Sequence, residues 1–92
     1  MARYLVEIPH DSDKVACNAA IRILLESGSH FLSNADWGCL DGDHRAWLVV
    51  EVDSREQARQ IVPPELRPRA HIVRLIKFEM DAGGRRILQR DE

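Results

Sequence analysis

A β-hairpin is predicted by the stretch SHFLSNADWGCLDGDHRAWLVVEV, residues 29–52. Its second arm, Arg45–Val52, alternates apolar side chains as a half-buried strand does, and Asp41-Gly42 is a dipeptide typical of a tight two-residue turn. The first arm, His30–Leu40, carries several polar groups where a buried strand would carry Val and Ile. Such groups need solvent or a pocket with partners, so this hairpin is expected to hold the functional surface.

The rest of the chain adds two strands and two helices to the hairpin. Together the elements follow the order strand, helix, strand, strand, helix, strand, which is the βαββαβ pattern of the ferredoxin-like fold. This predicts an α+β domain over residues 1–80, with an antiparallel four-stranded sheet and two helices on one face. Residues 81–92 are expected to be a flexible or marginally helical tail. The added elements are a strand at Tyr4–Ile8, a helix from Asp13 to Ser27 after a Ser12 cap, a helix at Arg55–Val62 capped by Ser54, and a strand at Ala70–Phe78.

Both faces of the expected sheet are apolar. If alternate residues of strand Arg45–Val52 face the helices, Trp47 and Val49 point to the other side. A monomer seldom exposes so large an apolar face, and a second copy packed back to back would bury it. The sequence therefore predicts a homodimer.

The composition of the chain indicates which kinds of partner and which cellular compartment to expect. The chain has 13 basic and 15 acidic residues, and the two signs are interspersed, which disfavours nucleic-acid binding. Nothing approaches the roughly 20 consecutive apolar residues of a membrane span. Two cysteines in unlike segments do not suggest a secreted disulfide scaffold, so reduced thiols and a cytoplasmic location are expected.

Several short motifs, quoted at the end of this paragraph, resemble those of a group of small bacterial proteins that looks like a branch of the dimeric α/β-barrel superfamily. The resemblance covers about residues 2 to 80, and it implies ferredoxin-like subunits paired as a homodimer. Relatives by fold include small monooxygenases, muconolactone isomerase-like enzymes, stress-responsive proteins and nickel-binding proteins, so the resemblance implies architecture far better than chemistry. The motifs are Gly28-Ser-His-Phe31, Ala35-Asp-Trp-Gly-Cys-Leu-Asp-Gly42, Ala46-Trp47, Val50-Glu-Val-Asp-Ser54 and Pro63-Pro64 with Arg67.

The leading functional hypothesis is a small-ligand-binding or stress-related module. Its pocket is predicted to be bordered by His30, Asp36, Trp37 and Cys39, which lie close together in the first arm. The main alternative is a cofactor-independent monooxygenase or isomerase, in which His10, His30 or Asp36 serves as general acid or base.

A nickel or zinc protein is a further alternative. His30, Asp36, Cys39 and His44 supply the ligand types that bind these metals, although their spacing matches no standard closed site. Across a two-residue turn, Cys39 would lie directly opposite His44 and could touch it. The competing interpretation makes Cys39 a small core side chain and His44 a solvated turn residue.

Overall fold

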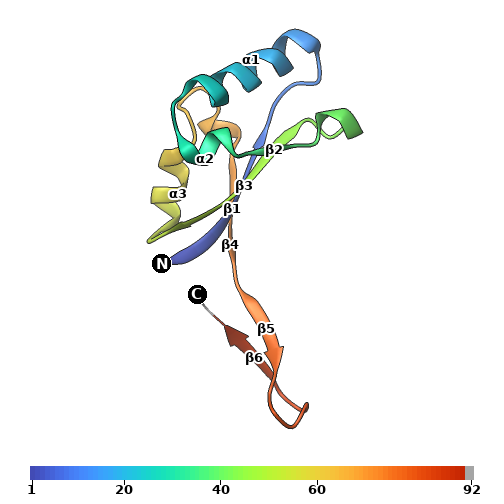
Figure 1. Ribbon diagram of the computed structural model, residues 1–92, viewed down its shortest axis with the longest axis vertical. Coiled ribbons are helices and arrows are strands. Elements are labelled where there is room, and N and C mark those ends of the chain that lie inside the picture. The colour runs from blue at the N-terminus through green and yellow to red at the C-terminus, as the bar shows by residue number, and fades with distance from the viewer. Residues whose placement is uncertain (91–92) are drawn as a thin grey trace.

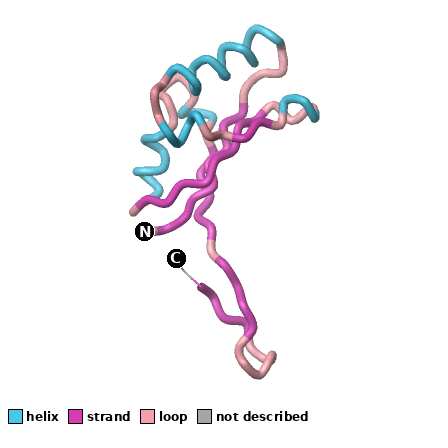
Figure 2. Tube along the Cα trace, viewed as in Figure 1, coloured by secondary structure: helices cyan, strands magenta, loops and turns pink. Residues whose placement is uncertain are grey.

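Residues 1–90 are described by a computed structural model, which has α+β architecture (Figure 1). One antiparallel four-stranded sheet has the strand order β2-β3-β1-β4. The helices α1, α2 and α3 gather on one side of this sheet, and a separate two-stranded sheet, β5-β6, extends from its far end (Figures 1 and 2). Within residues 1–90, no helix has the length and apolar character needed to cross a membrane. The elements are β1 (Ala2–Pro9), α1 (Lys14–Glu26), α2 (His30–Ser33), β2 (Asp36–Trp37), β3 (Arg45–Val52), α3 (Arg55–Ile61), β4 (His71–Leu75), β5 (Lys77–Met80) and β6 (Ile87–Arg90), with single 3-10 turns at Cys39–Asp41 and Arg67–Arg69.

The core lies between the sheet and the helices. Strand β1 is central and alternates strictly, so that every second side chain is buried. Val6, for example, is fully buried and stands opposite Leu48 of β3 and Ile72 of β4. This period-two pattern of apolar residues is what fixes the register, because a slip by one residue would turn the apolar set toward solvent.

Side-chain caps define the two longer helices. Helix α1 begins after Asp13, whose carboxylate accepts a hydrogen bond from the Ala16 backbone N–H at 2.8 Å, so the cap lies one residue later than the predicted Ser12. Gly28 follows the helix at φ 79°, a left-handed conformation that favours glycine. The predicted cap of α3 is confirmed, since Ser54 Oγ accepts from the Gln57 N–H at 3.1 Å.

The predicted continuous strand over residues 30–40 is wrong. Polar side chains there bind nearby backbone instead of standing in a sheet: Ser29 caps the short helix α2, and the Asn34 amide donates to the His30 carbonyl at 2.8 Å. Only Asp36 and Trp37 pair with β3, and a 3-10 turn then ends at Gly42, whose φ is 84°. The antiparallel hairpin is therefore real, but the predicted two-residue turn is replaced by a longer connection.

The C-terminal segment also differs from the expected frayed or helical tail. Strand β4 ends at Leu75 rather than continuing to Phe78, and β5 and β6 form their own antiparallel hairpin (Figure 2). The sequence explains this, because apolar Phe78 and Met80 alternate with charged residues before a turn that contains Gly84 at φ 69°. Residues 91–92 of the predicted tail lie outside the described part of the chain.

The face of the sheet opposite the helices is partly apolar, as predicted. Leu5 of β1 stands between Val49 of β3 and Val73 of β4, and the Val49 side chain is 55% exposed. Ile72 is buried on the helix side, which places Val73 and Leu75 on the open face. We call Leu5, Val49, Val73 and Leu75 the open apolar face.

Candidate metal centre

Two histidines meet where β1 and β3 diverge. The backbone N–H of His10 donates to the carbonyl of His44 at 3.0 Å, which extends the ladder one step beyond the Pro9 and Arg45 pair. The two imidazole rings then lie edge to face, with centroids 5.6 Å apart. His10 is the only polar side chain among residues 1–90 that is buried, with 6% of its surface exposed.

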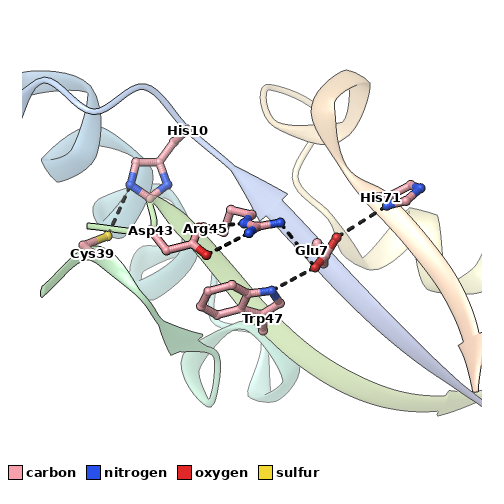
Figure 3. A network of polar contacts seen from close by, with 7 residues as sticks. All are labelled: Glu7, His10, Cys39, Asp43, Arg45, Trp47 and His71. Carbon is pink, nitrogen blue, oxygen red and sulfur yellow. Dashed lines mark hydrogen bonds and ion pairs between the residues drawn. The ribbon is translucent and has the colours of Figure 1, made fainter. Parts of the chain in front are cut away.

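Two cysteines complete a cluster around these rings. Cys17 comes from α1 and Cys39 from the 3-10 turn, and their sulfur atoms are 3.6 Å apart. The Cys39 Sγ also lies 3.4 Å from His10 Nε2. Figure 3 shows the two side chains pointing toward each other. One ligand atom from each of His10, Cys17, Cys39 and His44 lies within 4.8 Å of all the others. We call these four residues the Cys2His2 cluster.

The spacing of the cluster fits a tetrahedral metal ion. Bonds of about 2.3 Å to sulfur and about 2.0 to 2.1 Å to imidazole nitrogen define a tetrahedron with edges of about 3.8 Å between sulfurs and about 3.6 Å between sulfur and nitrogen. The two contacts given above, 3.6 Å between the sulfurs and 3.4 Å from Cys39 to His10, are close to these edges. Small side-chain movements are enough to bring all four donors to one cation.

Burial holds His10 in the form that a metal ion requires, whereas the Cys39 thiol has to lose its proton on binding. Burial lowers the pKa of His10, and the neighbouring His44 and Arg69 lower it further, so His10 is held in the neutral form that binds metals. Burial and the neighbouring Cys17 thiol raise the pKa of Cys39, so that without a metal the Cys39 thiol keeps its proton. His44 Nδ1 is buried and has no hydrogen-bond partner among residues 1–90. Buried polar atoms normally have a partner, and a metal ion could serve as one here.

The segment that carries Cys39 and His44 is held by its own hydrogen bonds. The Gly38 carbonyl accepts from the N–H groups of Asp41 and Asp43 at 3.0 Å each, and the Gly38 N–H donates to the Arg45 carbonyl. Arg45 also donates two hydrogen bonds to the Asp43 carboxylate, at 2.6 and 2.7 Å, which lowers the pKa of Asp43. His44 is thereby fixed between two paired residues.

A second polar group centres on Glu7, on the face of the sheet away from the helices (Figure 3). Its carboxylate accepts a hydrogen bond from Trp47 Nε1 at 3.0 Å and lies 3.6 Å from Arg45 Nη1 and 3.4 Å from His71 Nδ1. The Arg45 guanidinium also lies over the Trp47 ring, 5.4 Å from its centroid. This network occupies one end of the sheet and keeps Trp47 half-buried.

The residues of the predicted ligand pocket divide between two places. His30 and Asp36 line a hollow of about 370 Å³, whereas Trp37 and Cys39 are not part of its lining. Trp37 instead packs edge-on against His10, with ring centroids 5.8 Å apart, and Cys39 belongs to the Cys2His2 cluster. Apart from buried Leu48, the lining is exposed. The hollow is lined by His30, Phe31, Asn34, Asp36, Leu48 and Val49.

The predicted metal ligands are also regrouped. Cys39 and His44 are brought together, but through the 3-10 turn rather than as a cross-strand pair, while His30 and Asp36 lie elsewhere. Cys17 is not among the ligands predicted from the sequence, and His10 is predicted only as a general acid or base. The available signal was the combination of two His and Cys pairs, one at residues 10 and 17 and the other at residues 39 and 44.

Comparisons with protein-family models, curated proteins and solved structures find no match for this chain.

Proposed function

We propose that this chain is a metal-binding protein that holds a zinc ion in the Cys2His2 cluster. The observation that carries the proposal is the convergence of four donor atoms within 4.8 Å from segments far apart in sequence. A cluster of two thiols and two imidazoles, one of them buried and neutral, is poorly explained by packing alone. It is the donor set of closed tetrahedral zinc sites.

Zinc is favoured over nickel by the donors and by their arrangement. Thiolate and imidazole together, at tetrahedral spacing, are typical of Zn²⁺, whereas Ni²⁺ prefers square-planar or octahedral sites. With four protein ligands, a tetrahedral ion has no open position for substrate. The proposed role is therefore to bind and retain the metal rather than to activate a water molecule.

A bound ion would also tie helix α1 and the 3-10 turn to the end of the paired strands β1 and β3. It would link the end of β1, helix α1, the 3-10 turn and the residue before β3. Of α1, only Ala20 and Leu24 are buried among the described residues, so the helix is weakly anchored near Cys17. Small domains bury a limited fraction of their surface, and a structural metal is one way to compensate.

The test is metal content and metal spectroscopy of the purified chain. We expect about one zinc per chain, and replacement by Co²⁺ should give the intense visible absorption of a tetrahedral thiolate site. Cys17→Ser and His44→Ala should each lose the metal. His30→Ala and His71→Ala are matched controls, because these two histidines lie outside the cluster, and they should keep it. Reduced wild-type protein without bound or bindable zinc would show the proposal to be wrong.

A second proposed function is the binding of a small ligand in the hollow beside α2. The hollow combines the Asp36 carboxylate and the His30 imidazole with the Phe31 ring, which suits a small molecule with a cationic or hydrogen-bonding group and an apolar body. Chemical-shift mapping with small amines and amides tests it. Shifts confined to the hollow that disappear in Asp36→Ala would support the proposal, and an absence of any shift at millimolar ligand would contradict it.

We also propose that the domain belongs to the ferredoxin-like class and acts as a homodimer. The strand order β2-β3-β1-β4, with α1 following β1 and α3 following β3, supports the first part of this proposal. The open apolar face supports the second part, because a second copy would remove Val49 and its neighbours from water. Measuring the mass of the protein in solution tests the dimer.

A further inference from the structure

The Cys2His2 cluster has a second chemical capacity that does not require a metal. Cys17 and Cys39 are the only cysteines in the chain, both are free, and their sulfurs are 3.6 Å apart. A disulfide bond is about 2.0 Å long, so the sulfurs need to approach by less than 2 Å. The two thiols that would supply half of the metal ligands are therefore placed to bond to each other.

We propose that Cys17 and Cys39 form an intramolecular disulfide when the protein meets a peroxide, and that this bond and the metal exclude each other. The inference rests on the proposed function, because it treats the same four residues as a metal site in the reduced protein. A sulfur atom in a disulfide is no longer a thiolate, and the thiolate is the form that binds metals. Two imidazoles remain, and they make a far weaker site than four ligands.

The reaction balances with hydrogen peroxide as the oxidant. One thiolate attacks a peroxide oxygen, the O–O bond breaks and hydroxide leaves, which gives a sulfenic acid. The second thiolate then attacks that sulfur, the S–S bond forms and a second hydroxide leaves. Two electrons pass from the sulfurs to the peroxide, two protons from solvent convert the hydroxides to water, and the metal ion is released.

The positions of the two cysteines leave them open to this reaction. Both side chains are half-buried rather than enclosed, so a peroxide can reach them. Cys39 lies in a single 3-10 turn that buries none of its own residues. Cys17 lies on the N-terminal side of Ala20 and Leu24, the buried residues of α1. The two sulfur atoms can therefore approach to bonding distance through movement of the 3-10 turn and of the N-terminal part of α1, without movement of the sheet.

The experiment titrates zinc-loaded wild-type protein with hydrogen peroxide. Metal release is followed with a chromogenic chelator, free thiols with a thiol reagent, and the product by mass spectrometry without reduction. We expect one zinc and two thiols to be lost together, a mass lower by two hydrogens, and a peptide pair that links residue 17 to residue 39. Dithiothreitol should restore both thiols and the ability to bind zinc.

Other outcomes separate this inference from the proposed function. If reduced protein never holds zinc, the proposed function is wrong, and peroxide treatment of the metal-free protein still shows whether the disulfide forms. Alternatively, zinc binds but oxidation adds oxygen atoms to the cysteines, links two chains, or leaves the metal in place. Any of these results would show that the proposed disulfide is wrong, and the proposed metal site would still be supported. His71→Ala, which keeps the cluster, should respond like wild type, and Cys39→Ser should form no intramolecular bond.

Discussion

Gly38 lies directly against the indole ring of Trp47. A Cβ placed on Gly38 would come within 2.7 Å of the ring atoms Cη2 and Cζ3 of Trp47 and of the Asp43 carbonyl oxygen. The glycine therefore allows the connection that carries Cys39 to pass close over β3. Because Trp47 is hydrogen-bonded to Glu7, the ring cannot turn away freely.

Gly38→Ala should consequently loosen the metal site. Overpacking of this kind typically costs about 1 to 3 kcal/mol, and here the shift falls on the residue next to Cys39. We expect a lower free energy of unfolding in urea and weaker zinc binding in a competition titration with a chelator. Gly83→Ala is the matched control, since the nearest atom to a Cβ there is 3.7 Å away, and it should leave both quantities nearly unchanged.

Zinc should raise the thermal stability of the reduced protein. A ligand present at a hundredfold excess over its Kd stabilises the folded state by about 2.7 kcal/mol. For a domain of this size the melting temperature should then rise by roughly 10 to 20 °C. Differential scanning calorimetry with zinc and with a chelator measures the difference. His44→Ala should abolish it and His30→Ala should retain it, whereas equal melting temperatures for wild type under both conditions would contradict a closed site.

The metal-free protein should lose stability as the pH falls through about 6.5. The pKa of His10 is lowered from 6.5 in the folded state, so between the two values the unfolded chain binds more protons than the folded one. Stability therefore rises with pH across that window and levels off above it. Urea unfolding in a chelator, at steps from pH 7.5 to 5, measures this slope. The slope should be smaller in His10→Gln than in the wild type, and equal slopes in the two proteins would contradict this assignment.

Sequence periodicity predicted most of the scaffold, because that scaffold depends on local patterns. The alternation in β1 and β3 and the Ser54 cap each depend on neighbours in the sequence, and they appear where they were expected. The predicted strand over residues 30–40 is wrong because Ser29 and Asn34 satisfy backbone groups of a short helix, and that helix competes with strand pairing. The hairpin β5-β6 differs from the predicted tail because every residue of its two strands is exposed, so no buried apolar face marks these strands in the sequence.

Only two of the four residues of the candidate metal centre could be brought together from the sequence. Cys39 and His44 are close in sequence, so the hairpin alone was enough to suggest their contact. His10 and Cys17 reach them only because β1 pairs with β3 and α1 then returns over the 3-10 turn. That convergence is a tertiary relationship, and no spacing rule within one segment contains it.

The final prediction concerns the open apolar face. Leu5 is flanked by Val49 and Val73, and a second copy packed against them would bury all three. We expect sedimentation equilibrium to give a dimer, and Val49→Lys to weaken it by at least about tenfold, because the new charge would be buried without a partner. Val15→Lys is the matched control, since Val15 is 80% exposed on α1, away from the sheet. A wild-type protein that stays monomeric at high concentration, or a Val49→Lys variant that dimerises as well as Val15→Lys, would show that this face is not the interface.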